Sequence, residues 1–285
     1  MTLDALRRFY AAEIAAVSHL TSQRLVDAFA RVPREVFLGP GPWQIATGFE
    51  SENPYRTTPD ADPAHIYHNV VVALDPARQL NNGQPSALAR WIEACDIADG
   101  DTVAHIGCGV GYYTAIIAEL AGATGRVVGY EVVPELAERA RGLLAPWPAV
   151  EVRCDDGSAP PADTYDVMFV NAGVTFAPPV WLAALRPNGR LVMPLTFQMP
   201  LLPHGIGAMV RIQRTASGDF TARLFSQVGI YGCSIARDPA HEAELRQMMN
   251  PTAARRVAAL DTSPHERSAA CIVHVAGFCL RAAAD

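Results

Sequence analysis

Hydrophobic residues near the N-terminus recur at the three- and four-residue spacing that gathers side chains on one face of a helix. This spacing runs through residues 3–30 and breaks at residues 18–22, so it predicts two helices. Thr21 or Ser22 is suited to cap the second helix, because a side-chain oxygen there can accept a hydrogen bond from a backbone N–H of the first turn. Prolines between residues 32 and 42 then end the helical pattern.

Polar and turn-forming residues dominate the segment that follows. Residues 47–68 are rich in Pro, Asp, Thr and Asn and predict a loop. The apolar run at residues 70–74 indicates a short strand or extended segment. Pro85 opens a helix that continues to about Cys95, since the missing N–H of proline costs nothing at the start of a helix.

Strand and helix patterns alternate regularly beyond residue 100. The predicted strands cover residues 103–106, 127–131, 150–154, 165–171 and 190–195, and the predicted helices cover residues 113–121, 134–145 and 178–185. Such alternation implies βαβ units with right-handed crossovers, and therefore an α/β fold with a mostly parallel central sheet.

The pattern changes after residue 195. Residues 209–213 and 220–230 flank the turn Ser217-Gly218-Asp219, which predicts an antiparallel C-terminal hairpin. Residues 240–260 return to helical spacing, and residues 271–275 indicate a last strand or an extended tail. The predicted division is an N-terminal helical extension with a substrate-side loop (1–80), a central domain (81–235), and a C-terminal helix and tail packed on that domain (236–285).

Composition narrows the class of protein. Of the 285 residues, 50% are hydrophobic and 18% charged, so the chain can bury a large core and is too apolar to be disordered. The net charge of −6, without a basic run, argues against a nucleic-acid partner. No apolar stretch reaches the length of about 18 residues that a membrane-spanning helix needs. We therefore expect a cytoplasmic protein that binds neither nucleic acid nor a membrane.

The six cysteines stand singly, and no C-x-x-C pair occurs. This argues against a zinc site or a dithiol redox motif, so we expect no metal. Cys95, Cys108 and Cys271 lie among apolar residues, which is typical of small core residues in a reducing compartment.

The glycine-rich turn after the strand at 103–106 carries the strongest chemical signal. Gly107, Gly109 and Gly111 precede a helix, where glycines allow a sharp bend and a close approach of a ligand to backbone N–H groups. A dinucleotide fingerprint needs the spacing G-x-G-x-x-G, but here the third glycine comes one residue early and Tyr112 takes the later position. The turn resembles the nucleoside-binding turn of S-adenosylmethionine (SAM)-dependent methyltransferases. A plain structural connection is the alternative.

Polar residues end the following strands at the same predicted sheet edge. Glu131 ends the second strand, and its carboxylate can accept hydrogen bonds from both hydroxyls of a ribose, or simply be solvated. Asp155-Asp156-Gly157 follows the third strand, where a carboxylate can bind an adenine amino group or the segment can form a turn. Asn171 ends the fourth strand. Because the carboxyl ends of parallel strands share one edge, these residues together favour a nucleoside site.

Residues from about 20 to 195 resemble the protein-L-isoaspartate O-methyltransferases, which are SAM-dependent class I methyltransferases. The matching segments are Arg31–Phe37, Gln84-Pro85, His105–Tyr112, Asp156-Gly157, Tyr165-Asp166 and Leu185–Pro194. The resemblance implies a Rossmann-like class I fold and SAM as cofactor. The residues expected to bind it are His105, Gly107, Cys108, Gly109, Gly111, Tyr112, Glu131, Val132, Asp155, Asp156, Gly157 and Asn171, with backbone groups acting at Cys108 and Tyr112.

Two positions depart from the family pattern. The family usually has an acidic residue two positions before the first glycine of the turn, where this chain has His105. The family's substrate loop usually reads Thr-Ile-Ser-x-Pro, and here Gly83 takes the place of the Ser. We expect Asn82, Gly83 and Gln84 to position the acceptor without acid–base catalysis, with Asn82, Gln84 or Ser86 as sources of hydrogen bonds.

Methyl transfer to a carboxylate needs alignment more than acid–base catalysis, because a carboxylate is already nucleophilic at neutral pH. The leading hypothesis is therefore a SAM-dependent O-methyltransferase acting on a peptide, protein or small-molecule carboxylate. Arg56, His65, His68 or Arg78 could neutralise such an acceptor, although each is also a common kind of surface residue. The alternatives are a methyltransferase of another small molecule or modified peptide, a catalytically silent SAM-binding protein, and a nicotinamide oxidoreductase, which the glycine spacing disfavours. The sequence does not determine the oligomeric state.

Overall fold

The computed structural model describes residues 1–47, 54–78, 80–158, 164–199, 204–233 and 236–283. The chain divides into two compact units. The first unit contains residues 1–100, 108–127 and 133–152, and the second contains residues 101–107, 128–132 and 153–285. The three-part division at residues 80 and 235 stays a prediction. No helix within the described ranges is long and apolar enough to cross a membrane.

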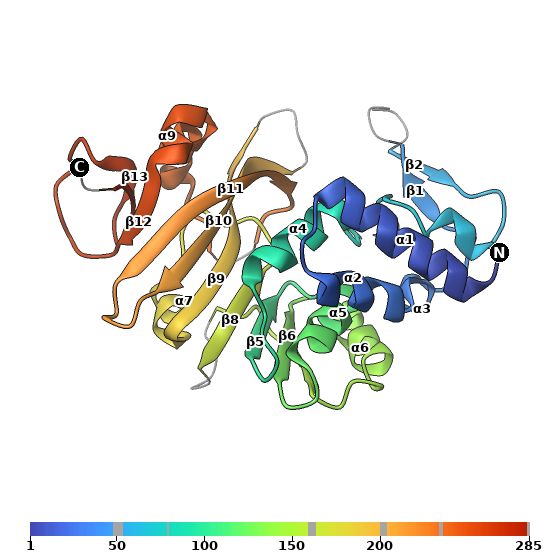
Figure 1. The fold of residues 1–285 in the computed structure, drawn as a ribbon. Coiled ribbons are helices and arrows are strands. Elements are labelled where there is room, and N and C mark those ends of the chain that lie inside the picture. Colours follow the sequence, from blue (N-terminus) through green and yellow to red (C-terminus); the bar gives the residue numbers. More distant parts are fainter. Residues whose placement is uncertain (48–53, 79, 159–163, 200–203, 234–235, 284–285) are drawn as a thin grey trace. The chain divides into compact units, whose positions relative to one another are not determined.

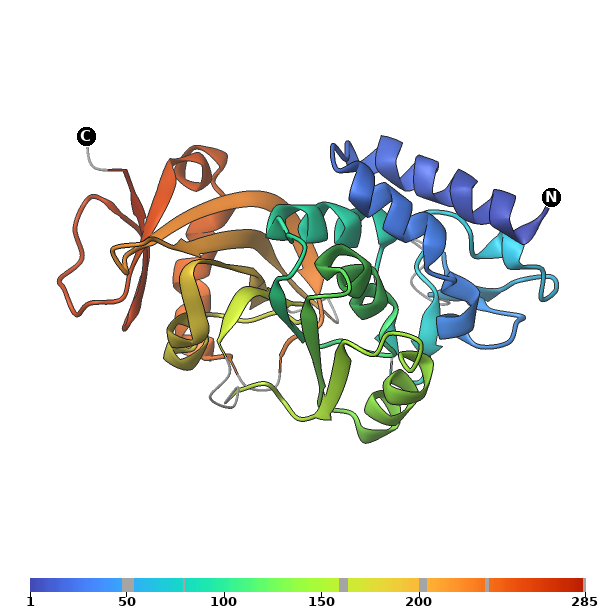
Figure 2. The same cartoon turned by 60° about the horizontal axis from the view of Figure 1, so that its bottom comes forward.

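Helices α1 (Leu3–Ser18) and α2 (Gln23–Arg31) confirm the two predicted N-terminal helices. Ser22 is the cap of α2, because its side chain accepts a hydrogen bond from the Leu25 N–H at 3.3 Å. Helix α1 packs against α2 and against α4 (Pro85–Cys95), the helix predicted to open at Pro85 (Figures 1 and 2).

A short helix, α3 (Arg34–Leu38), follows Pro33, so the prediction that the prolines end the helical pattern is wrong. Pro33 stands at the N-cap, where its missing N–H breaks no helical hydrogen bond. The helix buries Phe37 and the entire Arg34 side chain. The Arg34 guanidinium donates to three backbone carbonyl oxygens between residues 66 and 70 at 2.6–2.8 Å. Arg34 thereby fixes the chain that leads towards the predicted substrate loop.

Short elements interrupt the loop predicted at residues 47–68. Strand β1 (Gln44–Ala46) pairs antiparallel with β2 (Tyr55–Thr57), and a 3-10 helix, η1, covers Pro63–His65. Strand β3 (Ala73–Asp75) pairs with β4 (Leu80–Asn81) and lies slightly later than the strand predicted there. Residues 48–53 of the predicted loop lie outside the described residues. These strands are too short to produce the alternating pattern on which strand prediction depends.

One ten-stranded sheet has the strand order β13-β14-β12-β11-β10-β9-β8-β5-β6-β7. Its strands are β5 (Thr102–Ile106), β6 (Arg126–Glu131), β7 (Val150–Cys154), β8 (Tyr165–Val170), β9 (Leu185–Gln198), β10 (Gly205–Arg214), β11 (Phe220–Ile230), β12 (Val257–Asp261), β13 (Cys271–Val275) and β14 (Phe278–Ala282). The helices along this part of the chain are α5 (Tyr112–Ala121), α6 (Pro134–Leu143) and α7 (Pro179–Ala184). Strand β8 pairs in parallel with both β5 and β9, which agrees with the predicted α/β fold.

The antiparallel part of the second unit is larger than the predicted hairpin. Strands β10 and β11 form that hairpin, and β9 pairs antiparallel with β10. Strands β12, β14 and β13 then extend the ladder towards the C-terminus, as the orange and red strands of Figure 1 show. Strand β13 confirms the strand indicated at residues 271–275, whereas β14 was not predicted.

The continuous helical stretch predicted at residues 240–260 is wrong. The chain forms η2 (Pro239–His241), α8 (Glu242–Leu245), η3 (Arg246–Met249) and α9 (Pro251–Arg256), and β12 begins directly afterwards. Pro251 cannot continue a preceding helix, because it has no N–H to donate. The Asn250 side chain caps α9 instead by accepting from the Thr252 N–H at 2.9 Å.

Candidate functional site

Predicted cofactor residues meet at the carboxyl ends of the parallel strands in the second unit. Backbone hydrogen bonds join these ends: Gly107 N donates to Tyr130 O at 2.9 Å, Asp155 N to Glu131 O at 3.1 Å, and Asn171 N to Ile106 O at 2.8 Å. We call the residues gathered there the strand-end cluster: Gly107, Glu131, Asp155, Asp156, Gly157 and Asn171. This edge is where open α/β sheets bind their ligands.

Two glycines of the cluster have backbone conformations in which any other residue would be strained. Gly107 has φ +77°, and a Cβ there would lie 3.2 Å from the Asn171 carbonyl oxygen. Gly157 has φ +70°, and a Cβ there would lie 3.2–3.4 Å from atoms of the Ile106 side chain. L-residues rarely adopt such φ values, so both glycines are required by the backbone itself. A Cβ at either position would make a tight contact with a neighbouring strand end, so the two glycines favour the close approach of these ends.

The carboxylates of the cluster differ in exposure. Glu131 is buried, with 7% of its surface exposed, whereas Val132 beside it is 52% exposed. Asp155 is exposed and accepts from the Gly157 N–H at 2.8 Å. Hydrogen bonds from Ser158 hold the pKa of the Asp156 carboxyl below its usual value, so this group is ionised at neutral pH. The edge thus combines anionic acceptors with one exposed apolar side chain.

His105, expected near the cofactor, is fully buried in strand β5. Its ring stacks on Phe169, with ring centroids 5.2 Å apart and an interplanar angle of 23°. Burial lowers the pKa of His105 to about 3, so the imidazole is neutral at physiological pH. His105 therefore does not supply the charge of the family's acidic residue, and its contact with a cofactor stays a prediction.

The glycine turn continues from Gly107 into the first unit. Gly111 N donates to Cys108 O at 3.0 Å, and Gly111, with φ +94°, forms the N-cap of α5. Gly109 has φ +57°, and no heavy atom lies within 4 Å of the position a Cβ would take. The side chains of Cys108 and Tyr112 are buried, and the Tyr112 ring lies 5.7 Å from that of Phe37. Only backbone groups of Cys108 and Tyr112 are therefore suited to bind a ligand.

Side chains of the predicted substrate loop mainly hold the first unit together. Asn82 is buried, and its Oδ1 accepts from the Val72 N–H at 3.1 Å. The Gln84 side chain donates to Asn69 O at 2.8 Å, and Asn69 Oδ1 accepts from the Ser86 N–H at 3.0 Å. Asn82 and Gln84 thus shape the loop through these hydrogen bonds.

Gly83 has a conformational role in the same loop. Its φ is +75°, and a Cβ would lie 2.8 Å from Leu88 Cδ2. Its N–H donates to Asn81 Oδ1 at 2.9 Å, which stabilises the turn. The loop conformation therefore disfavours the serine that the family pattern places here.

The four side chains of the first unit that could neutralise an acceptor carboxylate differ in their ion-pair partners. His65 Nε2 lies 2.9 Å from Asp60 Oδ1, His68 Nδ1 lies 3.7 Å from Glu13 Oε2, and Arg78 Nε lies 2.7 Å from Asp75 Oδ2. Asp75 also raises the pKa of Arg78. Arg56 forms no ion pair with the part of the chain that the structure describes.

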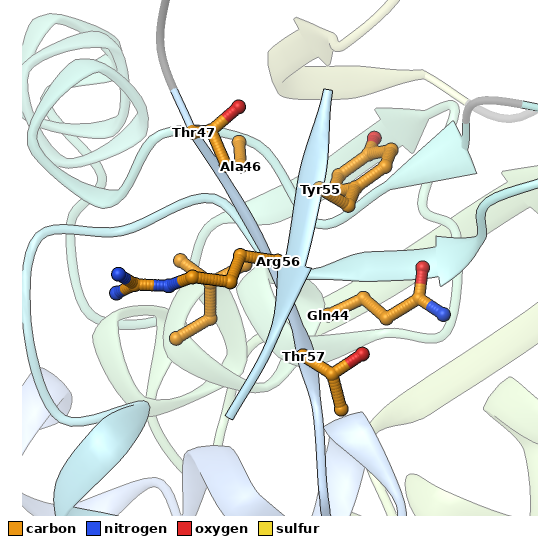
Figure 3. Close-up of a pocket in the computed structure, with 7 residues that line it drawn as sticks. Gln44, Ala46, Thr47, Tyr55, Arg56 and Thr57 are labelled. Atoms are coloured by element: carbon orange, nitrogen blue, oxygen red, sulfur yellow. The ribbon is translucent and has the colours of Figure 1, made fainter. Parts of the chain in front are cut away.

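Arg56 lines a cavity of about 540 Å³ along β1 and β2. The other lining residues are Gln44, Ile45, Ala46, Thr47, Tyr55 and Thr57. Figure 3 shows Tyr55 and Gln44 on one side of the two strands and the Arg56 guanidinium extending to the other. The Tyr55 hydroxyl accepts from Asn81 Nδ2 at 3.4 Å, which connects this hairpin to the predicted substrate loop.

Sequence reasoning missed two residues that organise this side of the first unit, Arg34 and Asn69. Arg34 holds the chain at residues 66–70 through three carbonyl oxygens, and Asn69 binds the start of α4. Arg34 lies in the specific segment Arg31–Phe37, so its motif was found although its role was not. No sequence signal singled out Asn69.

Comparison with known proteins identifies the family. The family model described as Protein-L-isoaspartate(D-aspartate) O-methyltransferase matches residues 12–204. Protein-L-isoaspartate O-methyltransferase 2 of Archaeoglobus fulgidus is 38% identical over 182 residues, which cover 61% of this chain and 71% of the relative. The protein-L-isoaspartate O-methyltransferase of Methanococcoides burtonii is 30% identical and covers 73% of this chain and 90% of its own.

Solved structures agree on the fold. A protein-L-isoaspartate O-methyltransferase superposes with a TM-score of 0.65 and 21% identity, covering 85% of this chain and 70% of its own. A β-aspartate methyltransferase of Plasmodium falciparum in complex with S-adenosyl-L-homocysteine gives a TM-score of 0.58 and 13% identity. This match covers 80% of this chain and 98% of the other. The sheet of the second unit, the glycine turn and these matches agree with one another: this chain belongs to the protein-L-isoaspartate(D-aspartate) O-methyltransferase family.

Proposed function

We propose that this chain is a SAM-dependent carboxyl O-methyltransferase that acts on an isoaspartyl or related carboxylate in a peptide or protein. The observation that carries the proposal is the buried Glu131 carboxylate at the end of β6, in the strand-end cluster. Family membership supports the same activity, because the relatives named above are protein-L-isoaspartate O-methyltransferases.

The strand-end cluster fits the nucleoside part of SAM. Glu131 would accept hydrogen bonds from the ribose hydroxyls, and the exposed Val132 would contact an apolar ring face. Asp156 and the backbone at Gly157 would bind the polar edge of the adenine. Within the first unit, Gly109 leaves open space over its backbone, and the contacts of Gly109 and Gly111 with the cofactor rest on the glycine spacing of the sequence. When bound, SAM supplies an electrophilic methyl group, whose transfer to a carboxylate oxygen leaves a methyl ester and S-adenosylhomocysteine.

On the acceptor side, this chain has to position and neutralise a carboxylate rather than remove a proton. We assign the neutralising role to Arg56, because it lines a cavity and has no ion-pair partner within the described ranges. His65, His68 and Arg78 each lie beside a carboxylate of the first unit. Asn82, Gly83 and Gln84 act by fixing the loop conformation, so the acceptor hydrogen bond of the usual serine must come from elsewhere or be dispensable.

Arg56→Gln tests this assignment against Arg78→Gln as the matched control. Because Arg56→Gln removes the charge of one exposed guanidinium, we expect it to raise the acceptor KM about two- to tenfold, with the SAM affinity unchanged. Arg78→Gln should leave both values near those of the wild type. Equal acceptor kinetics in both variants would reject Arg56 as the neutralising group.

Two measurements test the activity as a whole. Calorimetric titration with SAM, S-adenosylhomocysteine and NAD should show binding of the two sulfur compounds but not of NAD, and the absence of their binding would reject the proposal. Incubation with radiolabelled SAM and an isoaspartyl peptide should transfer label that mild base releases, since methyl esters are base-labile. No label on this peptide, together with base-labile label on another peptide acid, would keep carboxyl methylation and reject isoaspartate as the acceptor.

A further inference from the structure

A cluster of two histidines and two cysteines lies in the C-terminal part of the second unit, beyond the residues that the family model matches. The potential ligand atoms of His265, Cys271, His274 and Cys279 all lie within 4.8 Å of one another. We propose that these four side chains bind one Zn²⁺ ion. Nothing in the methyl-transfer chemistry uses these residues.

The geometry of the β13–β14 hairpin brings three of the side chains to one face. His274 pairs with Cys279 across the hairpin, and Cys271 pairs with Arg281. The register shifts between Cys271 and Val273, and this irregularity puts Cys271 on the same face as His274 although they are three residues apart. His265 reaches the cluster from the loop between β12 and β13, where its Nε2 lies 3.7 Å from Cys271 Sγ.

These separations approach those of a tetrahedral zinc site. With Zn–S bonds of about 2.3 Å and Zn–N bonds of about 2.0 Å, neighbouring ligand atoms lie about 3.3–3.8 Å apart. The distance between Cys271 Sγ and His265 Nε2 is already in this range. The widest separation, 4.8 Å, requires side-chain movements of about 1 Å.

The surroundings prepare the histidines to act as ligands. His265 Nδ1 lies 2.8 Å from the Ser263 carbonyl oxygen, to which it can only donate, so Nε2, which faces Cys271 Sγ, is the ring nitrogen left to bind a metal ion. His274 Nδ1 is buried and has no hydrogen-bond partner among the residues that the structure describes. Zinc-bound histidines typically show such a second hydrogen bond, and a buried nitrogen without a partner is costly unless a ligand satisfies it.

Both cysteines are buried. The Ser268 N–H donates to Cys271 Sγ at 3.3 Å, and the Ser268 hydroxyl lies 3.5 Å from the same sulfur. These contacts orient Cys271 Sγ and would stabilise it as a thiolate ligand of the ion. Nearby ion pairs balance the local charge, Arg281 with Asp261 and Arg267 with Glu244.

The ligand set defines both the metal and its role. Two thiolates and two imidazoles in a tetrahedral arrangement favour zinc among the common divalent ions. Four protein ligands leave no open coordination position, so the ion would be structural and would hold the β12–β13 loop against the hairpin. The single cysteines gave no C-x-x-C signal, yet the spacing His265-x5-Cys271-x2-His274-x4-Cys279 was present in the sequence.

The experiment uses the full-length, untagged protein purified without chelators. Elemental analysis should give about one zinc per chain, and the metal-free protein should take up one Co²⁺ with the absorption bands of a tetrahedral thiolate site. Cys279→Ser and His274→Gln should lose the zinc, whereas the matched control Cys233→Ser should retain it. Added Zn²⁺ should raise the Tm of the metal-free wild-type protein and not that of the two variants.

Two outcomes would overturn the proposal. One is a wild-type protein that holds no zinc as purified and binds Co²⁺ no more tightly than Cys279→Ser does. The other is a Cys271–Cys279 disulfide found by mass spectrometry of the untreated protein. The Co²⁺ titration of the wild type decides the question even if a variant fails to fold, and SAM binding is measured separately, so failure here leaves the methyltransferase proposal intact.

Discussion

The strand-end cluster and the substrate loop at residues 81–84 were both singled out from sequence, but they use their polar groups differently. In the strand-end cluster, backbone hydrogen bonds join the strands, while Asp155, which accepts from the Gly157 N–H, and Val132 beside the cluster remain exposed. In the loop, Asn82 and Gln84 are engaged in hydrogen bonds within the first unit. One region presents an exposed carboxylate, Asp155, at the edge of the sheet, and the other uses buried or half-buried amide side chains to hold its own conformation.

This difference teaches how a family motif can change while the cofactor chemistry persists. A nucleoside site made of backbone and strand-end carboxylates depends on glycine conformations, which this chain keeps. A substrate loop made of side chains can be rebuilt by substitution, as Gly83 and Asn82 indicate. We therefore expect substitutions in the first region to change cofactor binding, and those in the second to change stability or the choice of acceptor.

The largest effect is expected for Glu131→Gln. Loss of the charge weakens hydrogen bonds to the ribose, and since bonds to charged groups contribute about 1.5–3 kcal/mol, SAM affinity should fall roughly 10- to 100-fold. Calorimetric titration measures this value, with Glu135→Gln, an exposed glutamate in the first turn of α6, as the control. Equal SAM affinity in the two variants would show that the ribose is not bound at Glu131.

Asn82→Ala tests whether the loop side chain is structural. The substitution leaves the buried Val72 N–H without its acceptor, which should cost about 1–3 kcal/mol of unfolding free energy. Chemical denaturation measures the loss, with the exposed Gln227→Ala as the control. If Asn82→Ala kept the wild-type stability but lost methylation of the acceptor, Asn82 would act on the acceptor directly and the contrast between the two regions would fail.

His105→Phe tests the buried imidazole through the pH dependence of stability. Since the pKa of His105 is about 3 in the folded protein and about 6.5 when unfolded, the unfolded state binds more protons between these values. The neutral, buried His105 therefore contributes its full share of stability above about pH 6.5, and this share is lost as the pH falls towards 3. Between pH 7 and pH 5 the free energy of unfolding should fall by about 2 kcal/mol on account of His105.

The His105→Phe variant keeps an aromatic ring for stacking on Phe169 but has no imidazole to protonate. We therefore expect its free energy of unfolding to fall less between pH 7 and pH 5 than that of the wild type. Urea unfolding at pH 7 and pH 5 measures it, and the exposed His19→Asn should behave like the wild type. The same acid loss in wild type and His105→Phe would show that His105 is not the buried neutral group described above.

The smallest effect is expected for Gly83→Ser, which restores the usual residue of the family loop. Because of the positive φ and the contact with Leu88, we expect a loss of about 1 kcal/mol of stability and no gain in methylation of an isoaspartyl peptide. Gly218→Ser, at φ +96° with open space around it, controls for backbone strain alone and should cost less. A Gly83→Ser variant that is as stable as the wild type and methylates the isoaspartyl peptide faster would contradict this prediction. It would show that the loop can still bind the family's usual acceptor through a serine.

Regular elements were predictable where local sequence carries their signal. The alternation from residue 102 to 198, the cap at Ser22 and the hairpin around Gly218 follow from spacing and turn chemistry. The helix after Pro33, the breaks around Pro251 and strand β14 did not follow, because short elements are stabilised by tertiary contacts rather than by their own pattern. Among the site residues, position along the chain placed Glu131 and Asn171 at strand ends, but it could not reveal the buried Arg34 and its carbonyl partners.

The sequence alone determined the class of fold, the glycine turn and the strand-end carboxylates, because these depend on local periodicity and on backbone conformations that few residues permit. Only the tertiary structure decided that His105 is buried and neutral, that Asn82 accepts a hydrogen bond from the Val72 N–H, and that two histidines and two cysteines converge near the C-terminus. The physical reason is that burial and convergence depend on register. One irregularity between Cys271 and Val273 determines which side chains share a face, and no local pattern encodes it.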